Sequence, residues 1–430
     1  HIGGGFARYS VDEAWHVPHF EKMLYDNAQL VSALAAWADD AHPEFADALT
    51  QAVAFMEREW RLDHGGFCAA LDADSEGEEG TYYLWTTAEL QSLLAPDEVA
   101  RLDLAFGLNG HSLWERDQHV LRRKADSDVD RRDLRDVLHK LQIWRDGPSG
   151  RVKPGLDNKV ITSWNALAAI ALAQAARRHA DVSLKPALRL GAYLRTQARV
   201  PHRQDLLRRT SHADGGPVHE GFAEDYAFTV EAFLELHQST QDRKWLQEAR
   251  ALMATAMDRL FDPEANTFWN NAQGSDTPFV RSRSMEDGVI PSANASFASG
   301  LWKLGWALDI KAWRELSRHM VRSRLAGATT LAESGKWGQV HLDQIDGFTT
   351  VVVAVGSDEQ RQAVTQAWWS SQRPGTWLEV VDAGDAHIPA WMEGKSPGPE
   401  GQPRWYVCQE GACQLAVDTA EQAWNLCPLS

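Results

Sequence analysis

The chain has 430 residues, of which 44% are hydrophobic and 24% are charged. This composition excludes a disordered, collagen-like or disulfide-dense chain, because there is enough apolar material to bury a substantial core. Asp and Glu outnumber Lys and Arg by 60 to 43, which gives a net charge of −17. Such an acidic surface repels nucleic-acid phosphates and anionic lipid headgroups, so we expect neither as a partner.

Hydrophobic residues recur at helical spacing over most of the chain, from about residue 15 to residue 330. The first predicted helix begins at Pro18 and carries an apolar face from Phe20 to Trp37. Further helices are predicted at 44–62, 129–145, 158–179, 184–199, 222–239, 243–260, 291–308 and 310–325. Strands are predicted at 349–355 and 377–381, on either side of a helix at 358–371.

Paired helices alternate with glycine-rich loops, which predicts repeated helical hairpins. The loops are Gly3–Phe6, His64–Phe67 and Asp214–Pro217. Glycine allows positive φ angles and a close approach of the backbone to a ligand. We therefore predict a mainly α fold over residues 1–335, in which six hairpins closing a ring would form an (α/α)6 toroid with a cleft at one end. Residues 336–430 are predicted to form a small α/β segment packed on it.

Tryptophan and cysteine are both informative. The 19 tryptophans favour either wide helix–helix packing or a cleft lined with flat aromatic faces, as in many sugar-binding sites. The four cysteines, at 68, 408, 413 and 427, are too few for a disulfide scaffold and do not form a zinc pattern. Cys408 and Cys413 are either a late disulfide or two free thiols. This cysteine usage predicts a reducing, cytoplasmic location.

The first residues and the longest uncharged stretch predict neither a signal peptide nor a membrane span. The first ten residues contain no apolar signal-peptide core, and the longest uncharged stretch, 160–176, is too short to span a bilayer. The sequence begins without Met and inside a motif. We therefore expect it to be part of a longer product.

The first motif runs from Arg8 to Asp26 and contains two histidines. We expect Pro18 in the first turn of the following helix, which would put His16 and His19 at the positive end of the helix dipole. That position would keep an imidazole neutral and able to accept a proton. The alternative is that both histidines cap the helix and satisfy buried groups.

The second motif, Asp72–Tyr83, is rich in carboxylates. Asp72, Asp74, Glu76 and Gly77 match the start of a calcium-binding loop, but Tyr83 stands where a bidentate Glu is required. We therefore predict an acidic hairpin turn and no bound metal. A short strand at 81–85 would follow and direct its aromatic residues, including Trp85, into the cleft.

Three further motifs stand at predicted helix entries, where capping is the alternative interpretation of each. Asp157–Asn165 leads into an apolar helix and carries Trp164 and Asn165. His219–Phe228 places Asp225 and Tyr226 in an apolar run, where a buried carboxyl would have the raised pKa that a general acid needs. Met285–Ala295 carries Asp287 in a loop and Asn294 in a first helical turn.

Together these blocks resemble the thioredoxin-domain-containing family of spermatogenesis-associated protein 20. The matching segments occur in the family's order, and the first two are long and specific: Gly3–Asp26, Gly65–Thr86, Asp157–Asn165, Asp225–Ala227 and Pro291–Asn294. Cys68 replaces the family's usual aromatic residue and Ala166 its usual glycine.

The resemblance implies a domain organisation. Members of this family carry an N-terminal thioredoxin-like domain, which we expect as a partner in the full-length product. The remaining part is similar to the six-hairpin glycosidase superfamily, whose (α/α)6 toroid is shared by N-acylglucosamine 2-epimerases. This comparison raises the expectation of a carbohydrate function but does not identify a reaction.

We consider two classes of function. The first is an enzyme or binding protein for a small sugar, without a cofactor or metal. An epimerase would use histidines among His16, His19, His212 and His219, whereas an inverting hydrolase would pair Asp225 with Asp157 or Asp287. Substrate-binding candidates are Arg8, Tyr25, Trp85, Trp164, Asn165, Tyr226 and Asn294. The second is a non-catalytic scaffold that presents a substrate or partner to the thioredoxin-like domain.

Overall fold

The structure is a computed structural model of the 430-residue chain. It describes residues 2–39, 41–115, 117–148, 150–212, 218–275, 280–326, 333–370, 375–382 and 390–427. The predicted glycine loop Asp214–Pro217 lies outside the described residues.

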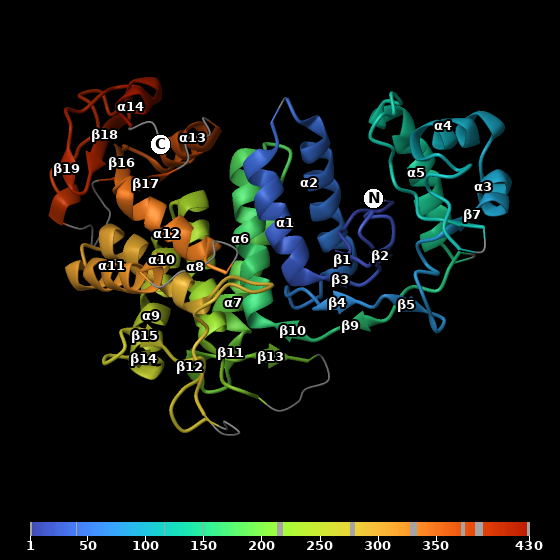
Figure 1. The fold of residues 1–430 in the computed structure, drawn as a ribbon. Helices are drawn as coiled ribbons and strands as arrows, with labels where there is room; N and C mark the ends of the chain where they lie inside the picture. Colours follow the sequence, from blue (N-terminus) through green and yellow to red (C-terminus); the bar gives the residue numbers. More distant parts are fainter. Residues whose placement is uncertain are drawn as a thin grey trace. The chain divides into compact units, whose positions relative to one another are not determined.

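The chain forms two compact units (Figure 1). The first unit contains His1–Asn27, Asp39–Leu62 and Phe67–Lys159, and the second contains Ala28–Ala38, Asp63–Gly66 and Val160–Ser430. The helix α1 (Leu24–Trp37) contributes to both. The predicted boundary between residues 335 and 336 stays a prediction.

The first unit combines helices with short strand pairs. Its helices are α2 (Pro43–Phe55), the π-helical turn η1 (Met56–Trp60), α3 (Thr87–Leu93), α4 (Pro96–Phe106) and α5 (Arg131–Asp146). Its strands are β1 (Tyr9–Ser10), β2 (Pro18–His19), β3 (Lys22–Met23), β4 (Ala70–Leu71), β5 (Asp74–Ser75), β6 (Glu78–Glu79), β7 (Trp85–Thr86), β8 (Gln118–His119) and β9 (Leu156–Asp157). They pair as β1–β2, β3–β4–β9, β5–β6 and β7–β8.

The core of the first unit lies between α3, α4 and α5. Leu90, Leu102, Phe106 and Leu141 are buried there around the ring of Trp85. Thr86 caps α3 through a capping box with Glu89, which sets the start of that helix beside the buried indole.

The second unit is built on three helical hairpins (Figure 1). They are α6 (Thr162–Arg178) with α7 (Lys185–Thr196), α8 (Ala223–Thr240) with α9 (Arg243–Arg259), and α10 (Ala293–Ala307) with α11 (Lys311–Leu325). The first helices of the hairpins contact one another in the order α6, α8, α10. Short strand pairs lie in the loops: β10 (Val160–Ile161) with β13 (Thr210–Ser211), β11 (Arg199–Val200) with β12 (Arg203–Leu207), and β14 (Phe261–Asp262) with β15 (Thr267–Phe268).

The two helices of each hairpin differ in the number of sides that they bury. α6, α8 and α10 are rich in Ala, Leu and Phe and are buried on most of their surface. In α7, α9 and α11 the buried residues occupy one stripe and charged residues the rest. This difference produces two layers of helices, with α6, α8 and α10 in the inner one.

The C-terminal part of the second unit contains a four-stranded sheet. Its order is β17 (Thr376–Val381), β16 (Thr349–Ala354), β18 (Arg404–Gln409) and β19 (Ala412–Cys413). β16 is parallel to β17 and antiparallel to β18, and it is buried on both faces. α13 (Asp358–Ser370) and α14 (Ala420–Leu426) contribute to the apolar cluster on one face, and the short helix η2 (Ala390–Met392) contributes Met392 on the other. Cys408 and Cys413 form a disulfide between β18 and β19.

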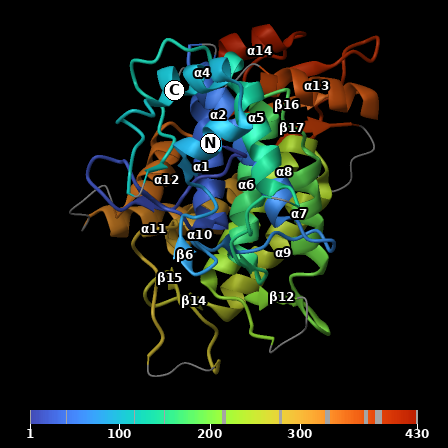
Figure 2. The same cartoon turned by 90° about the vertical axis from the view of Figure 1, so that its right-hand side faces the viewer.

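α8 lies beside β17 at the edge of this sheet (Figure 2). Side-chain amides at the C-terminal end of α8 join the two elements. Gln238 accepts the N–H of Leu378 at 2.9 Å and donates to its carbonyl at 3.1 Å, as a neighbouring strand would. Gln241 accepts the N–H of Val380 at 3.0 Å. A further helix, α12 (Gly335–Ile345), packs on α10 and α11.

These elements confirm the predicted mainly α fold of helical hairpins with a small C-terminal α/β part. The bounds of α6 to α11 lie within a few residues of the predicted helices. The predicted first helix is wrong at its start, because residues 18–19 and 22–23 form β2 and β3 and the helix begins at Leu24. The predicted strand at 81–85 is also wrong, since a strand begins only at Trp85. Among the described residues, no helix is long and apolar enough to span a bilayer.

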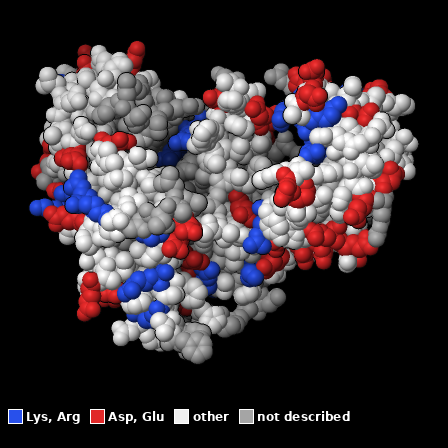
Figure 3. Space-filling view, viewed as in Figure 1, with Lys and Arg blue, Asp and Glu red and all other residues white. Residues whose placement is uncertain are grey.

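The tryptophans mostly support the packing interpretation. Trp60, Trp85, Trp302, Trp337 and Trp368 are fully buried, whereas Trp15 and Trp37 are strongly exposed. On the face of the molecule in Figure 3, acidic and basic side chains are interspersed with large uncharged areas.

Candidate functional site

The first unit contains a compact group of titratable side chains, which we name the Arg8–Asp26 cluster. Its members come from the residue before β1, from β2, from the turn between β2 and β3, from the start of α1, and from the β5–β6 hairpin: Arg8, His19, Glu21, Tyr25, Asp26 and Glu79. Three of these residues, Arg8, His19 and Tyr25, were predicted as site residues from the sequence.

The β1–β2 hairpin presents a flat aromatic face beside the cluster. Tyr9 lies directly opposite His19 in the strand register. Their rings stack with centroids 4.9 Å apart and an interplanar angle of 22°. Tyr9 is 51% exposed, and the guanidinium of Arg8 lies 5.8 Å from the centroid of its ring.

His19 lies between two carboxylates. Its Nδ1 is 2.8 Å from Oε1 of Glu79, and its Nε2 is 3.6 Å from Oε2 of Glu21. The contact with Glu79 fixes the orientation of the imidazole, so that the ring can exchange a proton at Nε2. This arrangement replaces the predicted role of the helix dipole, because α1 begins only at Leu24, five residues after His19 and eight after His16.

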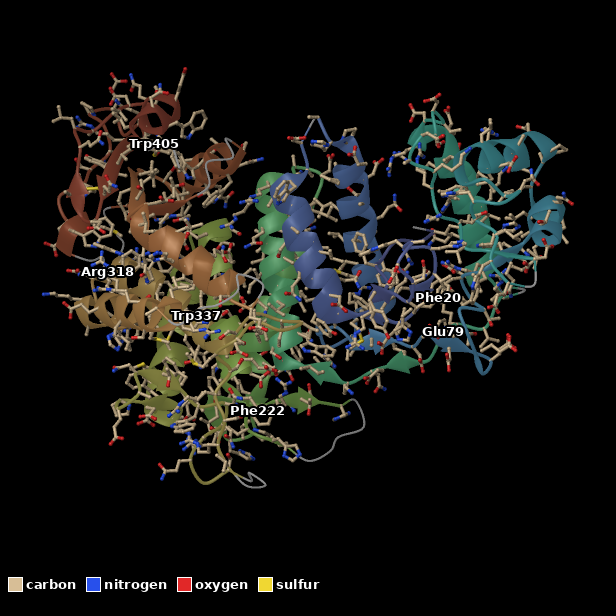
Figure 4. All side chains as sticks on the ribbon, viewed as in Figure 1. Phe20, Glu79, Phe222, Arg318, Trp337 and Trp405 are labelled. Carbon is tan, nitrogen blue, oxygen red and sulfur yellow. A yellow bond between two sulfur atoms is a disulfide. The ribbon has the colours of Figure 1, made fainter. Side chains whose placement is uncertain are left out.

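Glu79 is held in place by the packing of its neighbours. Its Oε1 also accepts the backbone N–H of Phe20 at 3.2 Å, and the two residues lie together in Figure 4. The next residue, Gly80, has a φ of +79°, and a Cβ there would come within 2.5 Å of the Phe20 ring. Glycine is therefore required for the carboxylate to reach both His19 and Phe20.

We expect Gly80→Ala to lower the free energy of unfolding by about 1–3 kcal/mol, because the new methyl group meets the Phe20 ring and the positive φ disfavours alanine. Urea denaturation of the purified chain measures this effect. Gly77→Ala is the matched control, since Gly77 also has a positive φ but has no atom within 4 Å of its Cβ position. Equal losses in the two variants would contradict the role of the Phe20 contact.

Asp26 is the carboxyl of the cluster whose pKa is shifted far from its ordinary value. Burial raises its pKa from 3.8 to about 6, and the nearby Glu21 also raises it, while Arg8 and a hydrogen bond from Tyr25 lower it. Its Oδ2 is buried and accepts no hydrogen bond from any residue that the structure describes. A carboxyl with this pKa and an unused oxygen can give or take a proton near neutral pH.

Arg8 contacts both Glu21 and Tyr25 in the cluster. Its Nη1 lies 3.3 Å from Oε2 of Glu21, and the guanidinium also contacts the Tyr25 hydroxyl. The side chain is about one-third exposed, so part of this cation faces solvent. Tyr25 is buried, and this burial and the charge of Asp26 raise the pKa of its hydroxyl.

The other predicted residues of the first unit lie outside the cluster. The Nε2 of His16 is buried and accepts no hydrogen bond within the described part of the chain. Trp85 is fully buried in the core under the guanidinium of Arg151, 4.4 Å from the ring centroid. Asp157 is 40% exposed and forms an ion pair with Lys159 at 2.8 Å.

Asp225 in the second unit connects two helix starts. Its Oδ1 accepts the N–H of Ser163 at 2.8 Å, and its Oδ2 accepts the N–H of Phe222 at 2.8 Å. Arg209 lies 3.1 Å from Oδ1. The carboxyl is fully buried, and this burial raises its pKa to about 6 despite the charge of Arg209. Both oxygens are therefore used in holding α6 and α8 together.

Three more predicted residues are buried at the same ends of the inner helices. Asn165 donates to the carbonyl of Ile161, and the Tyr226 hydroxyl accepts the N–H of Leu207. Asn294 accepts the N–H of Phe268 at 2.7 Å and donates to its carbonyl at 3.0 Å. These bonds satisfy buried polar groups, as the capping interpretation predicts.

Asp287 borders a solvent-open groove of about 240 Å³ in the second unit. The carboxylate accepts the backbone N–H groups of Ser292 at 2.8 Å and Lys336 at 2.7 Å. The groove is lined by Gln29, Asp287, Gly288, Ile290, Pro291, Gly335, Lys336 and Gln339. Of the other predicted residues of this unit, Trp164 is half-buried and His219 is exposed.

Glu21, Asp26 and Glu79 were not predicted as members of a site. The signal was present, because Glu21 and Asp26 belong to the first motif and Glu79 to the second. The described residues contain no group of three or more His, Cys, Asp or Glu side chains that could hold a metal ion.

Comparison with known proteins identifies relatives of this chain. It is 33% identical to spermatogenesis-associated protein 20 of Mus musculus over 361 residues, and 33% identical to the Homo sapiens protein of the same name over 362 residues. Each alignment covers 73% of this chain and 45% of the relative. An uncharacterised protein of Caenorhabditis elegans is 25% identical over 99% of this chain and 64% of its own length. The chain therefore spans about half the length of the mammalian relatives. The predicted relationship to spermatogenesis-associated protein 20 is confirmed.

No protein-family model matches the chain. Similar solved structures include a sugar epimerase from a ruminal bacterium, with 13% identity, a TM-score of 0.44, and 80% of this chain and 66% of the other covered. Cellobiose 2-epimerase of Bacillus thermoamylovorans has 10% identity, a TM-score of 0.47, and coverages of 76% and 67%. An α-mannanase of Bacteroides thetaiotaomicron has 12% identity, a TM-score of 0.45, and coverages of 81% and 73%.

Proposed function

We propose that this chain, a relative of spermatogenesis-associated protein 20, is an enzyme that moves a proton on a small sugar at the Arg8–Asp26 cluster. The observation that carries the proposal is the carboxyl of Asp26, which has a pKa of about 6 and a buried Oδ2 without a hydrogen bond from the described residues. Free carboxylates on protein surfaces titrate near pH 4, too low for efficient base catalysis at neutral pH.

The surroundings of Asp26 support a sugar as the ligand class. The exposed ring of Tyr9, stacked on His19, offers a flat apolar face for the C–H side of a pyranose. Glu21 and Arg8 offer an acceptor and a donor for hydroxyl groups at the edge of that face. A half-exposed aromatic ring with convergent polar groups is the general composition of small-molecule sites.

In the proposed reaction, Asp26 accepts a proton from a carbon next to a carbonyl of the open-chain sugar. Arg8 stabilises the negative charge that develops on the carbonyl oxygen. His19, oriented by Glu79, returns a proton from Nε2, and protonation on the opposite face of the carbon inverts its configuration. We favour this isomerase chemistry over hydrolysis, because both oxygens of Asp225 already accept hydrogen bonds within the protein.

The test of binding is a thermal-shift screen against monosaccharides, N-acetylhexosamines, uronic acids and short oligosaccharides. A ligand at 100 times its Kd stabilises a fold by about 2.7 kcal/mol, which is a readily measured rise in Tm. We expect at least one sugar to raise the Tm of the wild-type chain, and Tyr9→Ala to reduce that rise. Val11→Ala is the matched control, because Val11 is similarly exposed at 58%. No shift across the panel would contradict the proposal and favour the scaffold interpretation.

The remaining parts of the proposal concern the whole protein. We propose that the hairpins close into an (α/α)6 ring, that residues 336–430 form the separate α/β segment, and that the protein acts in the cytoplasm beside a thioredoxin-like domain. Asp157, Asp225, Asp287, His16 and His219 remain alternative catalytic candidates, and the substrate-binding candidates of the second unit remain predictions. These points are tested by determining the structure and the enzymatic activity of the full-length protein.

A further inference from the structure

A second group of charged side chains lies around Lys22 in the first unit. Lys22 is 6% exposed, and its ammonium donates a hydrogen bond to the carbonyl of Gly4 at 2.8 Å. It lies 4.7 Å from the centroid of the Phe55 ring and 4.8 Å from that of Tyr83. No carboxylate among the described residues forms an ion pair with it, which is unusual for a buried lysine.

Two arginines are held beside this lysine by the same stretch of backbone. The carbonyls of Ile2 and Gly3 accept hydrogen bonds from Arg145 at 3.1 Å and from Arg58 at 2.6 Å. Three consecutive carbonyls, at residues 2 to 4, therefore each bind one cation. This arrangement brings three positive charges together in a chain whose net charge is −17.

The cations line a small cavity of about 10 Å³, roughly the space of one water molecule. Lys153 adds a fourth cation to the lining, and Glu59 is the carboxylate among the lining residues. Glu59 is already engaged by Arg58 at 2.6 Å and Lys153 at 3.1 Å, and Arg145 is engaged by Asp146. Glu59 and Asp146 are close enough to act on the charge of Lys22, but both carboxylates pair directly with other cations, and no described carboxylate forms an ion pair with Lys22 itself.

We propose that this cavity is a binding site for a small carboxylate, which pairs with Lys22 and replaces Glu59 on Arg58 and Lys153. Arg58 and Lys153 are 37% and 50% exposed, so their side chains can move to admit a group larger than water. Guanidinium and ammonium groups converging on one point provide the charge and the N–H donors that a planar oxyanion requires. The site is separate from the Arg8–Asp26 cluster and does not depend on the proposed sugar chemistry.

The protonation of Lys22 agrees with this proposal. Burial, together with the charges of Arg145 and Arg58, lowers the pKa of Lys22 from 10.5 to about 7, although the nearby carboxylates of Glu59 and Asp146 act to raise it. An anion bound beside the ammonium would favour its charged form and raise the pKa again, so that binding takes up a proton at neutral pH. The anion should therefore bind more weakly as the pH rises above 7.

The experiment measures the Tm of the chain in increasing sodium formate, with sodium chloride at equal ionic strength as the reference. We expect formate to raise the Tm above the chloride value, and Lys22→Met to lose that additional rise. Lys140→Met is the matched control, because Lys140 is a half-exposed lysine of the same unit paired with Glu98. Glu59→Gln removes the competing carboxylate and should lower the half-saturating formate concentration by about 5-fold.

A second readout keeps the test decisive if Lys22→Met fails to fold. The pH dependence of the 13Cε chemical shift of Lys22, in wild-type chain labelled with 13Cε-lysine, reports its pKa without any reagent having to reach the buried amine. We expect a midpoint near 7 in chloride and a higher midpoint in formate. Equal Tm values in formate and chloride, an unchanged formate effect in Lys22→Met, or a midpoint near 10.5 in chloride would each overturn the proposal.

Discussion

Replacing Asp26 with asparagine is expected to slow proton exchange on the sugar substrate by about 10²- to 10⁴-fold, which is the range supplied by a positioned general base. The amide keeps the shape of the side chain but cannot take up the proton. The measurement is the rate at which deuterium from D2O enters the sugar next to its carbonyl, followed by NMR.

The pH dependence supplies an independent check of the same assignment. The wild-type rate should fall as the pH falls through about 6, because protonated Asp26 cannot act as a base. Asp97→Asn is the matched control, since Asp97 is a 75% exposed carboxylate of the same unit. An Asp26→Asn variant that exchanges as fast as this control would remove Asp26 from the mechanism.

The same substitution has an expected effect on stability with a defined sign. The pKa of Asp26 is raised in the folded chain, so its contribution to stability is complete below 3.8 and is lost as the pH rises through about 6. The stability of Asp26→Asn relative to wild type should therefore increase between pH 4 and pH 7. Urea denaturation at several pH values measures this change and also shows that the variant is folded.

The second large effect is expected at the junction between α8 and β17. Glu379 is 1% exposed and lies 3.1 Å from Nε2 of His237 and 3.6 Å from Arg243. Its carboxylate also accepts the indole N–H of Trp377 at 2.7 Å. Glu379→Ala should lower the free energy of unfolding by about 3–5 kcal/mol, because it leaves the His237 ring nitrogen and the Trp377 indole N–H without their buried partner and removes the counter-charge of Arg243, which is 15% exposed.

Chemical denaturation of Glu379→Ala and of Glu359→Ala tests this expectation. Glu359 is an exposed residue at the start of α13, and its loss should change the stability by less than about 0.5 kcal/mol. If Glu379→Ala lowers the free energy of unfolding by less than about 1 kcal/mol, the buried contact between Glu379 and His237 contributes little to the stability of the second unit.

Glu379 should also affect how the free energy of unfolding changes at acidic pH. Burial alone would raise its pKa, but the charges of His237 and Arg243 and the hydrogen bonds from His237 and Trp377 outweigh it, so the net pKa is lowered from 4.5. The stability that it contributes is present above pH 4.5 and is lost as the pH falls through the folded-state pKa. Glu379→Gln should therefore show a shallower loss of stability in acid than the wild-type chain.

Much of the helical fold could be predicted from local sequence. The 3.6-residue pattern and the entry residues of α6, α8 and α10 locate those helices closely, because their start signals and their apolar runs lie within one segment of the chain. The start of α1 could not be found in this way. Phe20, Met23 and Leu24 fit the helical pattern, yet Met23 pairs with Ala70 in a strand ladder that local periodicity does not report.

The candidate site was predictable in its residue types but not in its partners. Arg8, His19 and Tyr25 belong to one motif, whereas the contact between His19 and Glu79 joins positions 60 residues apart. The raised pKa expected for Asp225 is present, but the structure also shows that its oxygens cap α8 and hold α6. Only the folded chain distinguishes such a carboxyl from one with an unused oxygen, as in Asp26.

The most direct test of the proposed function is a titration of the Asp26 carboxyl. NMR of chain labelled with 13C at the aspartate carboxyl carbons, with Asp26→Asn used to assign the signal, gives its midpoint without knowledge of the substrate. We predict a midpoint near 6, displaced when a sugar from the thermal-shift screen is added. A midpoint near the ordinary value of 3.8 that no sugar changes would contradict a general base at this position.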